Sequence, residues 1–263
     1  MMYTRLGRNT VNAVRLAEIM QVLVRHGFAD LLNRAGFYNG LPARLLQGLN
    51  LMNAPEGEAA TLGQRLREAL AELGPTFVKM GQILSTRPDL VGASISQELV
   101  SLQDRVSPIP WEIMSLRIED ALNVPLDEVF ASISHDAVAS ASLSQVYRAV
   151  LRTGEQVAVK VQRPDIEKTI ESDLSLMRSA AEWIADHLEE TRLFDPVGIV
   201  DEFARSIRRE LDFTIEAMVV EQFGRNFADD ERVVIPRVHR QYSSRRLLML
   251  EWVDGVRADS LDD

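Results

Sequence analysis

The chain has 263 residues, of which 46% are apolar, and it contains no cysteine. This length suggests one large domain or two small ones, and the apolar share can fill a real core, which excludes disorder as the main state. The lack of cysteine excludes disulfide frameworks, thiolate zinc sites, iron–sulfur clusters and a cysteine nucleophile. A formal net charge of −10 argues against a nucleic-acid partner, because nucleic-acid binders usually present a basic surface.

Lysine is scarce in this sequence. Of the 29 basic residues only Lys79, Lys160 and Lys168 are lysines, and the rest are arginines, so each lysine is a candidate for a specific task. The chain has no run of about 18 uncharged apolar residues and no apolar leader with a cleavage site at its start. We therefore expect neither a signal peptide nor a transmembrane segment. The expected location is the cytoplasm.

The first 54 residues differ in charge from the rest, because they hold six arginines against Glu18 and Asp30. From about residue 9 to 32, apolar side chains recur at helical spacing, which predicts an amphipathic, mildly basic helix. This helix could pack its stripe on the core, or it could bind a membrane surface or another protein. The stripe consists of Leu16, Met20, Leu23, Val24, Phe28 and Leu31.

Short helices are expected between about residues 61 and 123, after a linker rich in glycine and proline that predicts a boundary near residues 50–60. Capping-box patterns and a proline after a glycine indicate where these helices begin. The expected starts are Thr61 with Gln64, Gly74 with Pro75, Ser94 with Gln97, and Trp111.

The periodicity then changes to that of strands. Apolar and polar residues alternate from 127 to 164, with Gly154 at a turn, which predicts a meander of three strands. The apolar runs 232–238 and 246–253 predict two more strands. The fold class is therefore α+β, with a five-stranded antiparallel sheet and a helical region before it.

Two long helices are expected between these groups of strands. One runs from residue 166 to 188, and Asp195 before Pro196 predicts the cap of another that continues to about residue 227. The expected division of the chain is 1–54 for the basic helical segment, 55–125 for a helical extension and 126–263 for the sheet domain.

Lys160 lies in the middle of the apolar strand VAVKVQ. Taken alone, such a lysine is usually on a solvent face. A meander precedes it, however, a helix that carries acidic residues follows, and a hinge-like segment MLEWVDG closes the set. This order matches the small lobe of a protein kinase, in which a third-strand lysine holds the α- and β-phosphates and a helix glutamate orients it.

A kinase normally covers the phosphates with a glycine-rich loop. Here Ala139, Ser140, Ala141 and Ser142 take that place. Because alanine disfavours positive φ and adds a methyl group, we expect a stiffer loop that covers a nucleotide differently. The alternative is an ordinary hairpin rich in small residues.

Four sequence blocks together resemble the UbiB family, the atypical kinase-like proteins linked to ubiquinone biosynthesis. They occur in the family's order and, with the hinge, cover residues 73–255. The blocks are the KxGQ motif at 79–82, the alanine-rich loop ASASLSQVY, the strand VAVKVQRP and the acidic segment ELDFTIEA. The resemblance implies an atypical kinase-like small lobe preceded by an all-helical extension.

The resemblance also implies roles for single residues. Lys160 would bind nucleotide phosphates and pair with Glu216, whereas Lys79 of the KxGQ motif would reach into the active site and meet Glu210 of the Glu-x-Asp motif. On one continuous helix Glu210 and Glu216 would point roughly 120° apart, which favours two separate lysine partners. The remaining motif residues are Gln82 and Asp212, the latter sharing a helical face with Glu216 at i,i+4 spacing.

In the hinge, the kinase analogy makes Leu250 the gatekeeper and directs the carbonyl of Glu251 and the amide of Val253 toward adenine. The sequence stops at Asp263, and it offers no candidate for the catalytic-loop or DFG aspartates of a large lobe. We therefore expect no metal ligands in this chain, and magnesium only with a large lobe. The chain is expected to be a fragment of a longer protein or a small lobe without its own catalysis.

The expected function is that of an ATP- or ADP-binding atypical kinase or ATPase of the UbiB type, which supports quinone lipid synthesis, although catalysis by this chain itself stays open. The alternative is a non-catalytic, nucleotide-gated or lipid-binding scaffold at a membrane surface. The expected partners are a nucleotide, a membrane surface or quinone-pathway lipids, and quinone-biosynthesis proteins. Peripheral binding at the inner face of the plasma membrane would fit either hypothesis.

Overall fold

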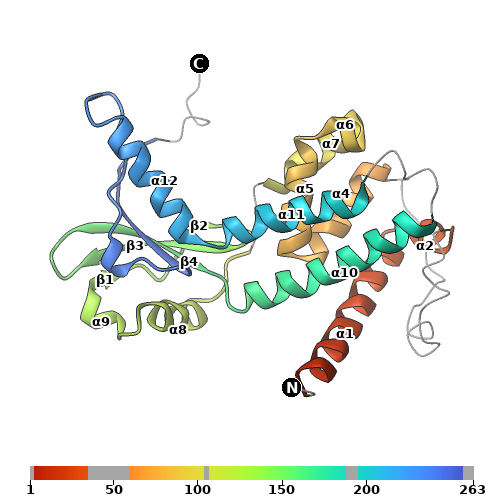
Figure 1. The fold of residues 1–263 in the computed structure, drawn as a ribbon. Helices are drawn as coiled ribbons and strands as arrows, with labels where there is room; N and C mark the ends of the chain where they lie inside the picture. Colours follow the sequence, from red (N-terminus) through yellow and green to blue (C-terminus); the bar gives the residue numbers. More distant parts are fainter. Residues whose placement is uncertain (1–2, 35–59, 104–106, 188–194, 257–263) are drawn as a thin grey trace. The chain divides into compact units, whose positions relative to one another are not determined.

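The computed structural model describes residues 3–34, 60–103, 107–187 and 195–256 (Figure 1). The chain forms two compact units, each built from two stretches of sequence. The helical unit comprises Met1–Arg105 and Glu167–Ser206, and the sheet unit comprises Val106–Ile166 and Ile207–Asp263. The linear division at residues 54 and 125 stays a prediction, and the linker expected before residue 60 lies outside the described residues.

The helical unit contains the KxGQ motif on a short helix that packs among several others. The elements are α1 (Tyr3–Arg25), α2 (Ala29–Arg34), α4 (Leu62–Leu73), α5 (Pro75–Ser85), α6 (Pro88–Val91), α7 (Ala93–Leu99), η2 (Val100–Gln103), α10 (Ile166–His187) and α11 (Pro196–Glu210). The last turn of α11, from Ile207, belongs to the sheet unit. The core of the helical unit contains Ile19 and Val22 of α1, Leu70 and Leu73 of α4, and Phe77 of α5.

One of the two predicted capping boxes is present in this unit and the other is not. The capping box of Thr61 and Gln64 is confirmed, since each side chain bonds to the backbone N–H of the other residue. The capping box predicted at Ser94 is wrong. The helix α7 begins earlier, with Gly92 at the N-cap in a positive-φ conformation, so Ser94 lies inside the first turn.

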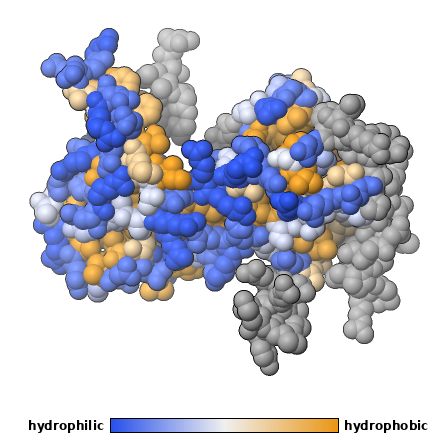
Figure 2. All heavy atoms as spheres, viewed as in Figure 1, coloured by the Kyte–Doolittle hydropathy of each residue, from blue (hydrophilic) through white to orange (hydrophobic). Residues whose placement is uncertain are grey.

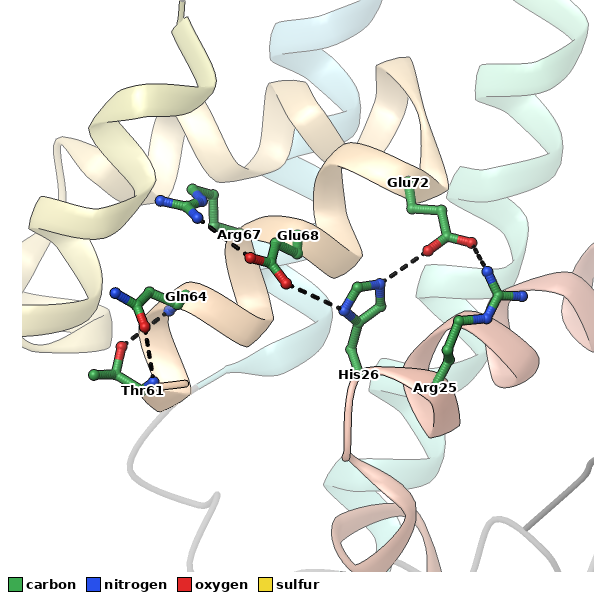
Figure 3. A network of polar contacts seen from close by, with 7 residues as sticks. All are labelled: Arg25, His26, Thr61, Gln64, Arg67, Glu68 and Glu72. Atoms are coloured by element: carbon green, nitrogen blue, oxygen red, sulfur yellow. Dashed lines mark hydrogen bonds and ion pairs between the residues drawn. The ribbon is translucent and has the colours of Figure 1, made fainter. Parts of the chain in front are cut away.

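The predicted helix over residues 9–32 is interrupted. The helix α1 ends at Arg25, and Gly27 turns the chain with φ of 80° before α2. At this end of α1, His26 Nε2 lies 2.9 Å from a carboxylate oxygen of Glu72 on α4, and Arg25 pairs with the same carboxylate (Figure 3). The apolar stripe is used in the unit itself, because Met20 and Phe28 are buried. The side chain of Leu31 lies outside the described residues.

A buried carboxylate joins three helices of this unit. Asp173 on α10 is fully buried and accepts hydrogen bonds from Arg15 Nε of α1 at 2.7 Å and from Thr76 Oγ1 of α5 at 2.6 Å. Arg15 also donates to the carbonyl of Leu73. The charge of Asp173 is thus paired, and the first turn of α5, the helix that carries Lys79, is tied to α10 through Thr76.

The sheet unit is built around an antiparallel sheet that has five strands in the described part of the chain. The spatial order is β1-β3-β4-β5, and β2 also pairs with β3. The predicted α+β architecture is therefore confirmed. The elements are α8 (Trp111–Leu122), α9 (Leu126–Val129), β1 (Phe130–Ile133), β2 (Ala139–Ser140), β3 (Ser144–Leu151), β4 (Gln156–Gln162), α12 (Phe213–Asn226), η4 (Arg240–Tyr242) and β5 (Leu247–Glu251).

The two faces of this sheet have different environments. One face forms the main core, where Val157, Val159 and Val161 of β4 pack with Met114 and Ile118 of α8. The other face carries a small cluster around Phe213 and Ala217 of α12 and Leu248 of β5. Alternation along each strand assigns successive side chains to these two faces.

The predicted membership of the sheet needs correction. The meander contributes four strands instead of three, because the short β2 precedes β3. The strand predicted over 232–238 is wrong, since only Val238 forms an isolated bridge, with Leu250. Pro236 lacks a backbone N–H, and Val234 is 70% exposed, so this run has neither a full ladder nor a buried face.

Within the described residues, no helix combines the length and the apolarity that crossing a bilayer requires.

Candidate functional site

Lys160 lies on the sheet face opposite the main core. In β4 the valines 157, 159 and 161 are buried in that core, so Ala158 and Lys160 point to the other side. The cross-strand neighbours of Lys160 are Val146 on β3 and Leu248 on β5. The strand pattern thus places a single cation on an otherwise apolar central strand.

Lys160 and Glu216 form the expected ion pair. Lys160 Nζ donates to both carboxylate oxygens of Glu216, at 2.8 and 2.6 Å, and also lies 4.9 Å from the ring centre of Phe213. The side chains remain 27% and 39% exposed, respectively. The ammonium is therefore held in one direction while it stays accessible to an anionic ligand.

Glu216 belongs to a helix that begins just before it. The predicted continuous helix to residue 227 is wrong, because α11 ends at Glu210 and α12 begins at Phe213. Asp212 is the N-cap of α12, and its Oδ1 accepts from the backbone N–H of Thr214 at 3.0 Å. Asp212 therefore does not share a helical face with Glu216, and its carboxylate stabilises the helix start.

Gln162 fixes this helix start, and sequence reasoning missed it. Its fully buried side-chain amide, two residues after Lys160, donates to the carbonyl of Leu211 and, at 3.3 Å, to that of Arg245. Phe213 N–H donates to the same Arg245 carbonyl. One strand therefore carries both Lys160 and the group that anchors the helix of its partner. A cap pattern, Asp-Phe-Thr, was the available signal for the break.

The helix α12 is attached to the sheet mainly through its first turns. Phe213 and Ala217 are its buried residues, whereas apolar side chains farther along remain in solvent (Figure 2). Arg240 of η4 adds a two-pronged ion pair with Glu221. The exposed apolar side chains are Met218, Val219, Phe223 and Phe227.

The alanine-rich loop is a tight hairpin beside β3. Ala139 and Ser140 form β2, and Ala141 N–H donates to the carbonyl of Ser144 at 2.9 Å. None of residues 139–142 adopts a positive φ, as expected for a loop without glycine. Ser142 is buried, whereas Ala139 and Ala141 are exposed. Arg163, a residue that sequence reasoning missed, contacts this loop directly.

The hinge segment follows β5, and the side chain of Leu250 near the end of this strand lies on the same sheet face as Lys160. Leu250 pairs with Ala158 and packs on the cluster around Phe213. The backbone N–H of Glu251 donates to the carbonyl of Arg237, and Val253 is 45% exposed. The adenine contacts of Glu251 and Val253 stay predictions.

The KxGQ motif lies on α5. Gln82 Nε2 donates to the carbonyl of Leu102 at 3.1 Å, and Gly81 is packed so closely that an added Cβ would collide with the Leu102 side chain. Gly81 and Gln82 therefore hold η2 against α5. Lys79 is half-buried on the same helix. Lys79 and Glu210 belong to different compact units, and their pairing stays a prediction.

The described residues contain no group of three histidine, aspartate or glutamate side chains that could hold a metal ion. We derive no chemical step through a metal from these residues.

The sequence comparisons agree on one family. Its description is "ABC1 atypical kinase-like domain", and its sequence model matches residues 101–263. Protein ACTIVITY OF BC1 COMPLEX KINASE 1, chloroplastic, from Arabidopsis thaliana is 45% identical over 74% of this chain and 29% of its own length. Probable protein kinase UbiB from Aliivibrio fischeri is 36% identical over 94% of this chain and 45% of its own length.

A solved structure is also similar. It is the complex of Rv3197 with erythromycin from Mycobacterium tuberculosis, with 30% sequence identity and a TM-score of 0.50 over 71% of this chain and 47% of that chain. The chain thus spans less than half the length of each of these three proteins.

Proposed function

Because the chain belongs to the ABC1 atypical kinase-like family, to which the UbiB proteins also belong, we propose that it binds ATP or ADP on the Lys160 face of its sheet. The resemblance drawn from the motifs is confirmed by these matches. In this proposal Lys160 binds the phosphates, and Glu216 orients the ammonium group.

One observation carries the proposal. Lys160 of the apolar strand β4 meets Glu216 of α12, with both carboxylate oxygens in contact with Nζ and more than a quarter of each side chain exposed. A fully buried structural pair would leave no room for a ligand, whereas this pair is open to solvent on one side. This geometry is suited to an ammonium group that Glu216 holds in position to bind a phosphate.

The neighbouring segments complete the proposed nucleotide site. The loop 139–142 would cover the phosphates, and the hinge backbone at Glu251 and Val253 would bind adenine. Lys79, with Gln82 on the same helix, would regulate the site through Glu210. Phosphotransfer or ATPase activity, which the resemblance to the UbiB family implies, is part of the same proposal.

We include in the proposal a role in quinone lipid synthesis at the inner face of a membrane, which family membership supports. The basic first helix does not support it, because Met20 of this helix and Phe28 of the turn after it are already buried in the helical unit. Flotation of the intact chain with anionic liposomes tests the membrane part. A bacterial strain that lacks its UbiB protein, and recovers quinone when it expresses this chain, tests the pathway.

Equilibrium titration with ADP and ATP tests the nucleotide site. We expect saturable binding by the wild-type chain and binding weakened at least tenfold in Lys160→Ala. The matched control is Lys168→Ala, which removes an exposed lysine at the start of α10 and should bind as the wild type does. A wild-type chain that binds neither nucleotide, or equal affinities in all three proteins, would contradict the proposal.

A further inference from the structure

Arg163 is the residue that follows β4, and only 9% of it is exposed. Its guanidinium joins two separate segments of the sheet unit. Nε donates to the carbonyl of Ala141 at 2.9 Å, and Nη2 donates to the hydroxyl of Ser140 at 2.8 Å. The same Nη2 donates to the carbonyl of Ser107, also at 2.9 Å. One side chain thus holds the alanine-rich loop and the segment before α8.

These contacts are stronger than ordinary loop contacts. The guanidinium is a charged donor, and a hydrogen bond with one charged member is roughly twice as strong as a neutral one. Burial lowers the pKa of Arg163 from its ordinary value, although arginine remains protonated at any physiological pH. The three acceptors are neutral oxygens, so they leave the positive charge of Arg163 beside the loop.

The segment that Arg163 reaches is itself fixed. Gln145 of β3 is fully buried, and its side-chain oxygen accepts from the backbone N–H of Ile109 at 2.6 Å. Its amide donates to the hydroxyl of Tyr147 at 2.8 Å. Ile109 is therefore attached to β3, and Arg163 ties the loop to the nearby Ser107 as well as to its own strand.

We propose that Arg163 is a positioning residue that fixes the 139–142 loop in the conformation that covers a nucleotide. The covering role rests on the nucleotide binding proposed above, whereas the fixing of the loop does not. A loop that is already ordered loses little conformational entropy when a ligand binds, so its conformation is reflected in affinity.

The expected effects separate Arg163 from a merely structural arginine. Arg163→Gln cannot reach all three acceptors, and we expect faster amide exchange at residues 139–143, most clearly at Ala141, whose N–H bonds to Ser144. Arg163→Lys keeps the charge but has one nitrogen for three acceptors. We therefore expect it to melt at a higher temperature than Arg163→Gln, while the amides of residues 139–143 exchange as fast as in Arg163→Gln. Ser140→Ala removes one acceptor and should produce a smaller increase at the same amides.

The test is hydrogen–deuterium exchange on the intact chain, followed by ADP titration of the same proteins. The control is Arg225→Gln, an exposed arginine on α12 that bonds to Gln222. We expect at least tenfold faster exchange in the loop of Arg163→Gln, unchanged exchange in β5, and ADP affinity reduced about tenfold. Two variants keep the test decisive even if Arg163→Gln fails to fold. If the loop amides of both Arg163→Lys and Ser140→Ala exchange at the wild-type rate, the positioning role is overturned. Faster loop exchange with unchanged ADP affinity would overturn the covering role, and a wild type that binds no ADP would refute the proposed function alone.

Discussion

Lys160 donates hydrogen bonds to both carboxylate oxygens of Glu216, although 56 residues of sequence separate them. The sheet supplies one partner and the first turns of α12 supply the other. Because both side chains are partly exposed, the pair contributes little to stability, on the order of 1 kcal/mol or less. In the proposed function its role is to orient the ammonium group.

Loss of the Lys160–Glu216 ion pair should therefore affect nucleotide binding much more than thermal stability. Glu216→Gln should lower the melting temperature only slightly but weaken ADP binding about tenfold, because the ammonium is no longer held by a charged partner. The control is Glu221→Gln on the same helix, which breaks the ion pair with Arg240 instead. ADP titration and thermal melts of the two variants check this, and equal loss of ADP affinity in both would contradict it.

Two glycine-to-alanine changes should have opposite effects. In Gly81→Ala the new methyl group would meet the side chains of Leu102 and Leu70, so we expect destabilisation by about 1–3 kcal/mol. In Gly224→Ala, on α12, the nearest atom would be 3.8 Å away, and the gain in helix propensity should stabilise by up to about 1 kcal/mol. Denaturant unfolding measures both, and Leu102→Val should partly rescue Gly81→Ala. Gly81→Ala as stable as the wild type would show that α5 and η2 are not closely packed.

The lowered pKa of buried His239 should make the stability of the fold depend on pH. Burial, helped by the positive charge of Arg237, lowers the pKa of His239 from its ordinary value of 6.5, against the opposite effect of Glu155 and Glu251. The unfolded chain then takes up a proton more readily than the folded chain. The stabilising contribution is complete above pH 6.5 and is lost as the pH falls from there through the depressed pKa.

Thermal melts between pH 7.5 and 5.5 measure this effect. We expect His239→Gln to reduce the fall in melting temperature on acidification, whereas His135→Gln, at an exposed histidine, should leave it unchanged. An equal fall in His239→Gln and the wild type would contradict the assignment.

Local patterns predicted those parts of the fold that depend on neighbouring residues. The cap at Thr61, the restart of the chain at Pro75 and the alternation around Lys160 each depend on a few adjacent residues, and the structure has all three. The pairing of Lys160 with Glu216 is a long-range contact, and it was predicted only because the motif order resembles a known family.

The missed features depend on tertiary contacts. Gln162 reaches Leu211 and Arg163 reaches Ser107, across 49 and 56 residues of sequence, and nothing near either residue indicates these partners. The run 232–238 has the composition of a strand, but Pro236 and the lack of a continuous partner leave only the bridge at Val238. The apolar periodicity through Leu211 concealed the break between α11 and α12, because Leu211 is buried as a helical residue there would be.

The scarcity of lysine allows the most direct test of the nucleotide site. The chain has only Lys79, Lys160 and Lys168, so acylation of each amine can be followed separately by mass spectrometry. We predict that saturating ADP slows the acylation of Lys160 at least fivefold and leaves that of exposed Lys168 unchanged. An acylation rate of Lys160 that is the same with and without ADP, in a chain shown by titration to bind ADP, would contradict the assignment of Lys160 to the phosphates.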